Sequence, residues 1–191
     1  MYKRQIEKAL DHGLYVVVRP PGVCPGGIKV DGYYQDYLLK VWDIVSSNTN
    51  IKKHSGQVSI ELANEPVNIY DADSLESARA PYDFFQPIVD KIRANGFDGI
   101  IWVPGTGWQS NYTCYKSNPI EGYNIGYAVH AYVGWYNNSD ENANGETFIQ
   151  EFGKAVPVVN TNPVIITEVD WSPEKEGEGH YDEHGNWVPA N

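Results

Sequence analysis

Five short apolar runs alternate with helical patterns along the chain, and this alternation limits the possible fold more than any other feature. Each run is rich in Val and Ile, has the length of one buried strand and is bounded by turn-forming or polar residues. Strands that alternate with helices predict an α/β fold with a parallel sheet. The expected strands are Leu14–Val18, Val58–Ala63, Gly99–Val103, Ile125–Tyr132 and Pro163–Thr167.

The segments around these runs carry the 3.6-residue periodicity of amphipathic helices. In one of them Tyr34, Leu38, Val41 and Val45 fall on a single stripe. Pro87 lies inside another and predicts a kink or a later helix start. The expected helices are Tyr2–His12, Tyr34–Ser47, Tyr82–Asn95 and Thr147–Val156.

Two architectures accommodate five parallel strands: a doubly wound sheet, or a segment of a larger barrel. The chain has no internal repeat, linker or low-complexity tract, so we expect residues 1–191 to form a single domain. After Trp171 the sequence becomes polar and rich in Gly, and we expect no further strand there.

Charge and hydropathy exclude two classes of partner. The net charge of −11 argues against nucleic acid, because phosphate binding needs clustered Lys and Arg. No apolar run approaches the roughly 20 residues that span a membrane, and Met1–Leu10 lacks the apolar core of a signal peptide. An acidic surface suits a soluble enzyme that acts on a neutral substrate.

Two glutamates stand directly after expected strands. Glu65 lies in the hexapeptide Glu61–Pro66, and Glu168 follows the fifth strand. The carboxyl ends of the strands build the active site of a barrel, so both side chains can face one site there. Retaining glycosidases use two carboxyl groups about 5–5.5 Å apart. Judged on position alone, a solvated or helix-capping Glu65 remains the alternative.

His130 and Tyr132 alternate along the fourth expected strand and therefore share a face. That face can point toward the two carboxylates, where an imidazole could bind substrate and a phenol could hold a nucleophile. Taken alone, the histidine is more simply explained as a structural residue.

Together these stretches resemble glycoside hydrolase family 5, which includes many cellulases and mannanases. The resemblance runs from about Leu14 to Trp171. It rests on three motifs at strand ends, in this order: Asn64-Glu65-Pro66, His130-x-Tyr132 and Thr167-Glu168.

The resemblance implies a retaining endo-glycosidase that hydrolyses a β-1,4-linked polysaccharide without a cofactor or metal. Cellulose or another β-glucan is the expected substrate, with mannan as the alternative. Glu168 would be the nucleophile and Glu65 the general acid/base. Asn64 would contact the sugar 2-hydroxyl, while His130 and Tyr132 would support substrate and nucleophile. Because a polysaccharide is too large to enter a cell, we expect the parent enzyme to be secreted.

Aromatic residues make up 13% of the chain, and we expect most of them in the core. Flat rings that follow strands can instead stack on the apolar faces of sugars. The remaining candidate substrate-binding residues are Trp108, Trp135, Trp171 and Arg19.

The chain also departs from the family pattern. The family barrel has eight strands, whereas the five found here correspond to strands three to seven, so we expect an incomplete TIM (β/α)8 barrel. An open barrel exposes two strand edges, which predicts self-association or a complementing chain. Arg19 stands where the family often has a His, and it could hold Glu168 electrostatically.

Two other functional hypotheses compete with hydrolysis. The chain could be a noncatalytic, vestigial glycan-binding fragment that keeps the carboxylates. It could instead be an unrelated α/β enzyme, but no GxGxxG, P-loop or GxSxG motif supports this.

Two features stay open at this stage. Asp140 to Glu151 fits the spacing of an EF-hand loop, although a polar surface loop is the simpler interpretation and we assign no metal site. Cys24 and Cys114 fit no metal or redox spacing and could pair only if their loops meet.

Overall fold

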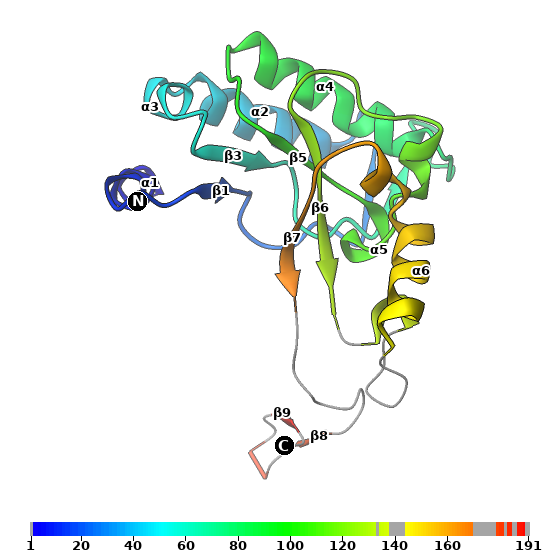
Figure 1. Ribbon diagram of the computed structural model, residues 1–191. Coiled ribbons are helices and arrows are strands. Elements are labelled where there is room, and N and C mark those ends of the chain that lie inside the picture. Colours follow the sequence, from blue (N-terminus) through cyan, green and yellow to red (C-terminus); the bar gives the residue numbers. More distant parts are fainter. Residues whose placement is uncertain are drawn as a thin grey trace.

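The computed structural model describes residues 2–132, 134–137, 144–169, 179–181, 183–184 and 187–189. Its centre is a parallel five-stranded sheet in the order β1-β3-β5-β6-β7. The sheet curls into a half-barrel with helices between its strands, as expected from the sequence (Figure 1). The strands are β1 (Val16–Val18), β3 (Val58–Glu61), β5 (Ile101–Pro104), β6 (Ile125–Ala131) and β7 (Val164–Val169).

The longer helices flank this sheet (Figure 1). They agree with the sequence prediction to within about two residues at each end, whereas the short helices α3 and α5 were not expected. The helices are α1 (Tyr2–Asp11), α2 (Tyr33–Ser47), α3 (Thr49–Lys53), α4 (Ala80–Ala94), α5 (Thr106–Gln109) and α6 (Gly145–Ala155), with 3-10 turns at η1 (Thr113–Lys116), η2 (Trp135–Asn137) and η3 (Pro157–Asn160).

Helices α2 and α4 pack side by side on the sheet (Figure 1). Leu38 and Trp42 of α2 are fully buried in the same core as Phe84 and Ile88 of α4. The indole Nε1 of Trp42 donates to the carbonyl of Leu62 at 2.9 Å. This bond fixes the end of β3, from which the Asn-Glu-Pro motif begins.

Pro87 lies inside α4, where it cannot donate to the carbonyl of Asp83. The buried Gln35 of α2 replaces that donor, since its Nε2 lies 3.1 Å from the Asp83 carbonyl and 2.7 Å from that of Phe84. The helix therefore continues through the proline, and the interhelical contact satisfies the carbonyl that the proline leaves free.

The sequence analysis missed two small sheets. Strands β2 (Gly27–Lys29) and β4 (Asn68–Tyr70) pair in parallel, and β8 (Gly179–Tyr181) pairs antiparallel with β9 (Trp187–Pro189). The prediction of no strand after Trp171 is therefore wrong. Three-residue strands are too short to show a periodic pattern, which is the signal that sequence analysis uses.

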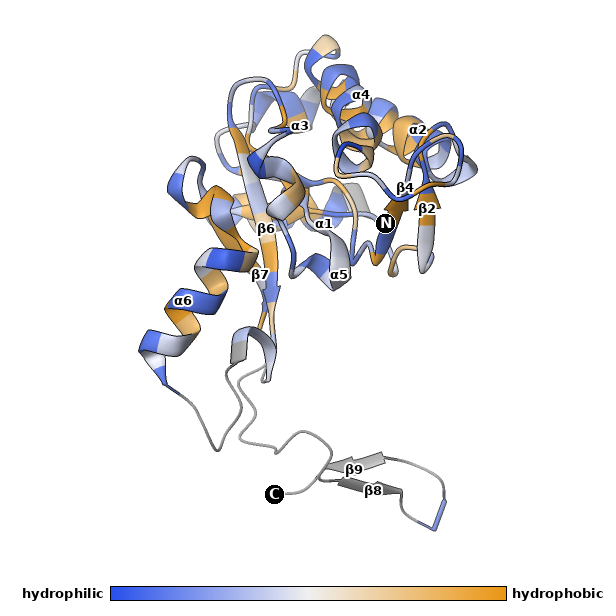
Figure 2. Ribbon diagram, turned by 90° about the vertical axis from the view of Figure 1, so that its right-hand side faces the viewer, coloured by the Kyte–Doolittle hydropathy of each residue, from blue (hydrophilic) through white to orange (hydrophobic). Residues whose placement is uncertain are grey.

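The two open features are resolved in part. Cys24 and Cys114 are both free thiols, and burial raises their pKa values to about 11 and about 12. Helix α6 begins at Gly145, so the second half of the supposed calcium loop is helical; residues 140–143 lie outside the described part of the chain. Figure 2 shows α6 carrying both hydrophobic and hydrophilic residues. Among the described helices, none is long and apolar enough to cross a membrane.

Candidate active site

The candidate site lies at the carboxyl ends of β1, β3, β6 and β7. Parallel strands bring these ends to one rim of the half-barrel. Six of the nine residues that the sequence analysis selected meet there through their side chains: Arg19, Asn64, Glu65, His130, Tyr132 and Glu168.

The Glu168 carboxylate is held from several sides. Its Oε1 accepts a hydrogen bond from Arg19 Nη1 at 2.5 Å, and its Oε2 accepts one from the Tyr132 hydroxyl at 2.6 Å. Burial raises the pKa of Glu168, but the hydrogen bonds from Tyr132 and Arg19 and the charges of His130 and Arg19 outweigh it. The net result is a pKa below the ordinary value for glutamate, which keeps this carboxylate ionised.

Glu65 faces Glu168 across the imidazole of His130. Nδ1 of His130 lies 3.1 Å from Oε1 of Glu65 and 3.4 Å from Oε2 of Glu168. The side chains of Glu65 and Glu168 are 18% and 22% exposed, so both carboxylates are reachable from solvent at the rim. Glu65 also has a φ of +55°, a left-handed conformation that is uncommon outside glycine.

His130 is fully buried beneath this pair. Burial alone would lower the pKa of the imidazole. The nearby Glu61 carboxylate, the hydrogen bond to Glu65 and the charge of Glu168 more than offset burial, so the pKa of His130 lies above its ordinary value. The site thus combines carboxylates with the Arg19 cation and with an imidazole whose pKa is raised.

An irregularity in β7 sets the register of Glu168. Val129 pairs with Ile166, but His130 pairs with Glu168, so Thr167 is an extra residue on β7. Such a bulge re-aims the side chains that follow it. Here the bulge brings Glu168 opposite His130, and no pattern in the sequence predicts it.

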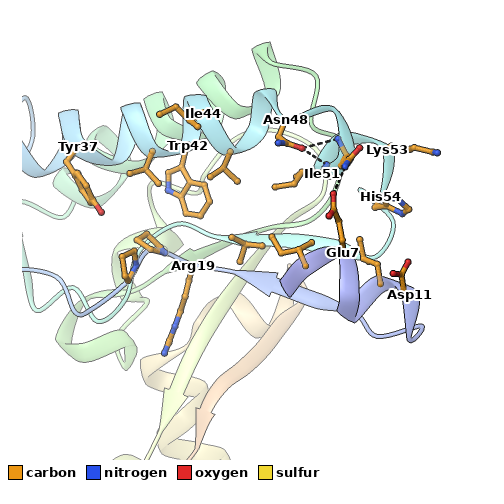
Figure 3. Close-up of a pocket in the computed structure, with 18 residues that line it drawn as sticks. Glu7, Asp11, Arg19, Tyr37, Trp42, Ile44, Asn48, Ile51, Lys53 and His54 are labelled. Carbon is orange, nitrogen blue, oxygen red and sulfur yellow. Dashed lines mark hydrogen bonds between the residues drawn. The ribbon is translucent and has the colours of Figure 1, made fainter. Parts of the chain in front are cut away.

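Asn64 links Arg19 to the strand end that carries Glu65. Its Oδ1 accepts Arg19 Nη1 at 2.9 Å, and its Nδ2 donates to the carbonyl of Gly22 at 3.2 Å. The amide is therefore oriented before any ligand binds. Arg19, labelled in Figure 3, extends away from α2 toward this rim.

The three tryptophans differ in position. Trp135 packs against Tyr132 with ring centroids 5.1 Å apart, and Trp108 is 53% exposed. Both line a surface hollow of 670 Å³ together with Glu151 and Lys154 of α6. Trp171 lies outside the residues that the structure describes.

A second, more apolar cavity of 470 Å³ lies between α1, β1 and α2 (Figure 3). Ile6, Val41, Trp42 and Val45 contribute to its walls, and neither Glu65 nor Glu168 lines it. Of the six side chains that meet at the rim, only Arg19 also lines this cavity.

Sequence reasoning missed two residues beneath the rim, Glu61 and Gln109. Both are buried, and Gln109 Nε2 donates to Glu61 Oε1 at 3.0 Å. A carboxylate inside the apolar run Val58–Ala63 was the available signal for Glu61, because charged groups are seldom buried without a role. Gln109 is the last residue of the short, irregular helix α5, and nothing in its sequence neighbourhood marks it.

Residues 1–190 match the family model described as Cellulase (glycosyl hydrolase family 5). The chain belongs to glycoside hydrolase family 5. This agrees with the resemblance that the three strand-end motifs indicated, and with the curled parallel sheet.

Individual relatives of this family 5 chain are distant and much longer. An endoglucanase of Halalkalibacter akibai is 26% identical over 200 residues, which cover 96% of this chain and 24% of that protein. An endoglucanase from a Bacillus species is 28% identical over 196 residues, which cover 96% of this chain and 20% of that protein. The chain thus spans a quarter or less of the length of these curated relatives.

Solved structures show the same fold. The catalytic domain of a Thermobifida fusca endoglucanase superposes with a TM-score of 0.64 at 22% identity, covering 96% of this chain and 54% of that one. A β-glucanase from Saccharophagus degradans gives a TM-score of 0.68 at 22% identity, with coverage of 92% and 55%. The family 5 chain therefore spans about half of these barrels.

Proposed function

We propose that this chain carries the catalytic pair of a retaining endo-β-1,4-glucanase, with Glu168 as nucleophile and Glu65 as general acid/base. The observation that carries the proposal is the separation of these two groups. One carboxylate oxygen of each lies within 4.8 Å of the other, with His130 between them. This favours a retaining mechanism, because inverting enzymes hold their carboxyl groups about 6.5–9.5 Å apart to admit a water.

The environments of the two carboxylates support the division of roles. Glu168 accepts hydrogen bonds from Arg19 and Tyr132, and its lowered pKa suits a nucleophile that must be ionised. Glu65 has no Arg or Lys partner among the described residues and contacts His130. This leaves Glu65 for the role of general acid/base.

The reaction follows from this arrangement as two displacements. Glu168 attacks the anomeric carbon while Glu65 protonates the departing glycosidic oxygen, which leaves a covalent glycosyl ester. Glu65 then takes a proton from water, and the water attacks the same carbon and releases Glu168. Two inversions at one carbon return its original configuration.

Asn64 and two tryptophan rings are proposed to hold the sugar. Asn64 is fixed by Arg19 and Gly22, so its amide is ready to contact the 2-hydroxyl next to the reacting carbon. Trp108 and Trp135 line one hollow and offer faces on which pyranose rings can stack.

The proposed substrate is a β-1,4-glucan, with mannan as the alternative. The curated relatives are endoglucanases, and the Thermobifida fusca endoglucanase and the Saccharophagus degradans β-glucanase were both solved with cellotetraose. Because a polymer of this kind stays outside cells, we propose that the parent protein acts there.

The test is release of reducing ends from carboxymethyl-cellulose and from mannan by the chain and by Glu65→Ala and Glu168→Ala. We expect release by the parent chain and a loss of at least about a thousandfold in both variants. Glu121→Gln, which removes one exposed carboxylate near the amino end of β6, is the matched control and should keep full activity. Absence of release by a folded parent chain on either polymer would contradict the proposal.

Stereochemistry tests the mechanism separately. With an aryl β-cellobioside as substrate, proton NMR should detect the β-anomer as the first product. Azide should rescue Glu168→Ala to an α-glycosyl azide and Glu65→Ala to a β-glycosyl azide, because azide replaces a different partner in each. Initial formation of the α-anomer would show inversion and refute the double displacement.

Noncatalytic glycan binding is the second candidate. It is favoured by the open sheet, since β1 and β7 are its two edges and do not pair with each other in the described structure. Glu168→Gln distinguishes the two functions, because it would abolish hydrolysis while leaving simple binding to cello-oligosaccharides intact.

A further inference from the structure

Glu61 is a carboxylate buried directly below the catalytic pair. It is the last residue of β3 and is 1% exposed. Its Oε1 accepts the Thr167 hydroxyl of β7 at 3.1 Å and Gln109 Nε2 at 3.0 Å. Among the described residues no Arg or Lys pairs with it, and the basic group that it faces is His130 Nε2, at 3.8 Å. A buried charge is costly unless it is paired, so this arrangement requires an explanation.

Gln109 connects Glu61 to the backbone of Glu65. Its Nε2 donates to Glu61 Oε1 and, at 3.1 Å, to the carbonyl of Ala128, while its Oε1 accepts the Glu65 N–H at 2.7 Å. Only one orientation of the amide satisfies all three bonds, because the carboxylate and the carbonyl are acceptors and the N–H is a donor. The side chain is fully buried and therefore fixed.

This bond acts where the backbone is strained. Glu65 has a φ of +55° and Gln109 itself a φ of +61°, and both are non-glycine residues in the left-handed region. Such conformations persist when surrounding contacts over-determine them. The Gln109–Glu65 bond is one such contact. Two more join the same segments, since Trp108 N–H donates to the Pro66 carbonyl at 3.1 Å and Gly107 N–H to that of Val67 at 2.9 Å.

His130 is the second connection between Glu61 and the catalytic pair. Its Nδ1 faces Glu65 and Glu168 from below, and its Nε2 faces Glu61. Nε2 is buried and has no hydrogen-bond partner within 3.5 Å among the described residues, so the carboxylate of Glu61 is the group that can receive its proton. An imidazolium, with a proton on each nitrogen, matches carboxylates on both sides.

We propose that Glu61 is a positioning residue for the reaction: it holds His130 as the imidazolium beneath the two catalytic carboxylates and, through Gln109, fixes the backbone of Glu65. The proposal rests on the proposed function, since it assigns a support to that catalytic pair. Glu61 does not touch the reacting atoms. It joins β3, the short helix α5 that ends at Gln109, β6 and β7 at one buried point, so its loss loosens the pair's alignment rather than the fold's core.

The charged groups around His130 determine the sign of the expected change. Glu61 approaches from β3, Glu65 from the segment after β3 and Glu168 from β7, while Arg19 lies behind Glu168. The Tyr132 ring packs 6.5 Å from the imidazole. Removing the Glu61 charge takes away one of three carboxylates that favour the imidazolium, so His130 should lose its proton at lower pH.

The first test is the titration of His130 followed by NMR of its ring nitrogens and carbons. The parent chain, Glu61→Gln and the Glu121→Gln control are compared, with His130→Asn to assign the signal. In the parent chain and the control we expect an imidazolium that persists above pH 6.5 (the ordinary histidine value); in Glu61→Gln the midpoint should fall. A neutral His130 at pH 6 in the parent chain, or an unchanged midpoint in folded Glu61→Gln, overturns the proposal. The parent-chain measurement decides the matter even if the variant does not fold.

The second test separates positioning from substrate binding. Gln109→Met keeps the length of the side chain but removes all three hydrogen bonds that the Gln109 amide makes. We expect kcat on carboxymethyl-cellulose to fall about tenfold or more, with KM within about twofold, because Gln109 is buried away from substrate. Glu61→Gln should also lower kcat and move the alkaline limb of the pH profile to lower pH. Unchanged kcat in both folded variants refutes the positioning role.

The two proposals fail in different ways. If the parent chain is inactive, the proposed function fails while the His130 titration still reports on Glu61. If the parent chain is active and depends on Glu65 and Glu168 but neither Glu61→Gln nor Gln109→Met alters kcat or the His130 midpoint, the function stands and the positioning role is refuted.

Discussion

Arg19 and Glu168 form an ion pair, 2.5 Å between Nη1 and Oε1, although they come from the two opposite edges of the five-stranded sheet. Arg19 follows β1, and Glu168 lies in β7. The sheet therefore curls far enough for the ends of its edge strands to meet over the active-site rim. The pair is partly exposed, so its main effect is on the charge of Glu168 rather than on stability.

Arg19→Gln should impair Glu168, the proposed nucleophile, without unfolding the chain. It removes the positive charge and the hydrogen bond on Glu168, so the pKa of Glu168 rises and the acid limb of kcat/KM moves to higher pH. We expect kcat to fall about tenfold at neutral pH, a loss of about 1.4 kcal/mol. Arg19→Lys keeps the charge but not the planar guanidinium, so its kcat should lie between those of the parent chain and Arg19→Gln. An acid limb that stays in place would contradict this role.

Stability should be highest between about pH 4.5 and 6.5. The folded pKa of Glu168 is lowered from 4.5, so its contribution is present above that value and is lost as pH falls through the folded pKa. The folded pKa of His130 is raised from 6.5, so its contribution is present below that value and is lost as pH rises through the folded pKa. Urea unfolding from pH 3 to 9 measures both limbs. Glu168→Gln should flatten the acid limb and move the alkaline limb to lower pH, because it also removes a charge that raises the pKa of His130. An unchanged acid limb would refute the assignment.

Gly126→Ala should destabilise the sheet, because Gly126 pairs with Trp102 across β5 and β6. A Cβ atom at position 126 would lie 2.3 Å from Cζ3 of the Trp102 ring, which is itself buried. We expect a loss of about 1–3 kcal/mol in the free energy of unfolding. Gly153→Ala is the control: it lies in α6 with nothing near its Cβ and should stabilise by about 0.5–1 kcal/mol. Equal melting temperatures for both variants would show that the contact is not restrictive.

The open edges should promote association. On β7 the side chains of Ile166 and Val169 are 47% and 60% exposed, and Val17 of β1 is also exposed. Unpaired strand edges with apolar side chains pair with other chains. We expect sedimentation to show species larger than a monomer at micromolar concentrations, and Ile166→Lys with Val17→Lys to reduce them. A monomer at every concentration tested would exclude this.

The strand-end motifs predicted much of the site because strand ends converge. Asn64, Glu65 and Glu168 each follow an apolar run, and parallel strands bring their carboxyl ends to one rim. His130 and Tyr132 are two residues apart along a strand, so their side chains share a face, and that face contacts Glu168. The sequence did not predict the roles of Glu61 and Gln109, which lie beneath these side chains. Gln109 reaches Glu61 and Glu65 because left-handed residues distort the short helix α5, and no periodic pattern encodes such a distortion.

The sequence by itself determined the α/β class, the five main strands and the family motifs, because these depend on local hydropathy and on residues adjacent in the chain. The tertiary structure alone decided which groups touch. The curl of the sheet brought Arg19 to Glu168, the bulge at Thr167 set Glu168 opposite His130, and burial joined Glu61 to Gln109. Those contacts depend on strand register and curvature, which arise from the packing of the whole sheet rather than from any one segment.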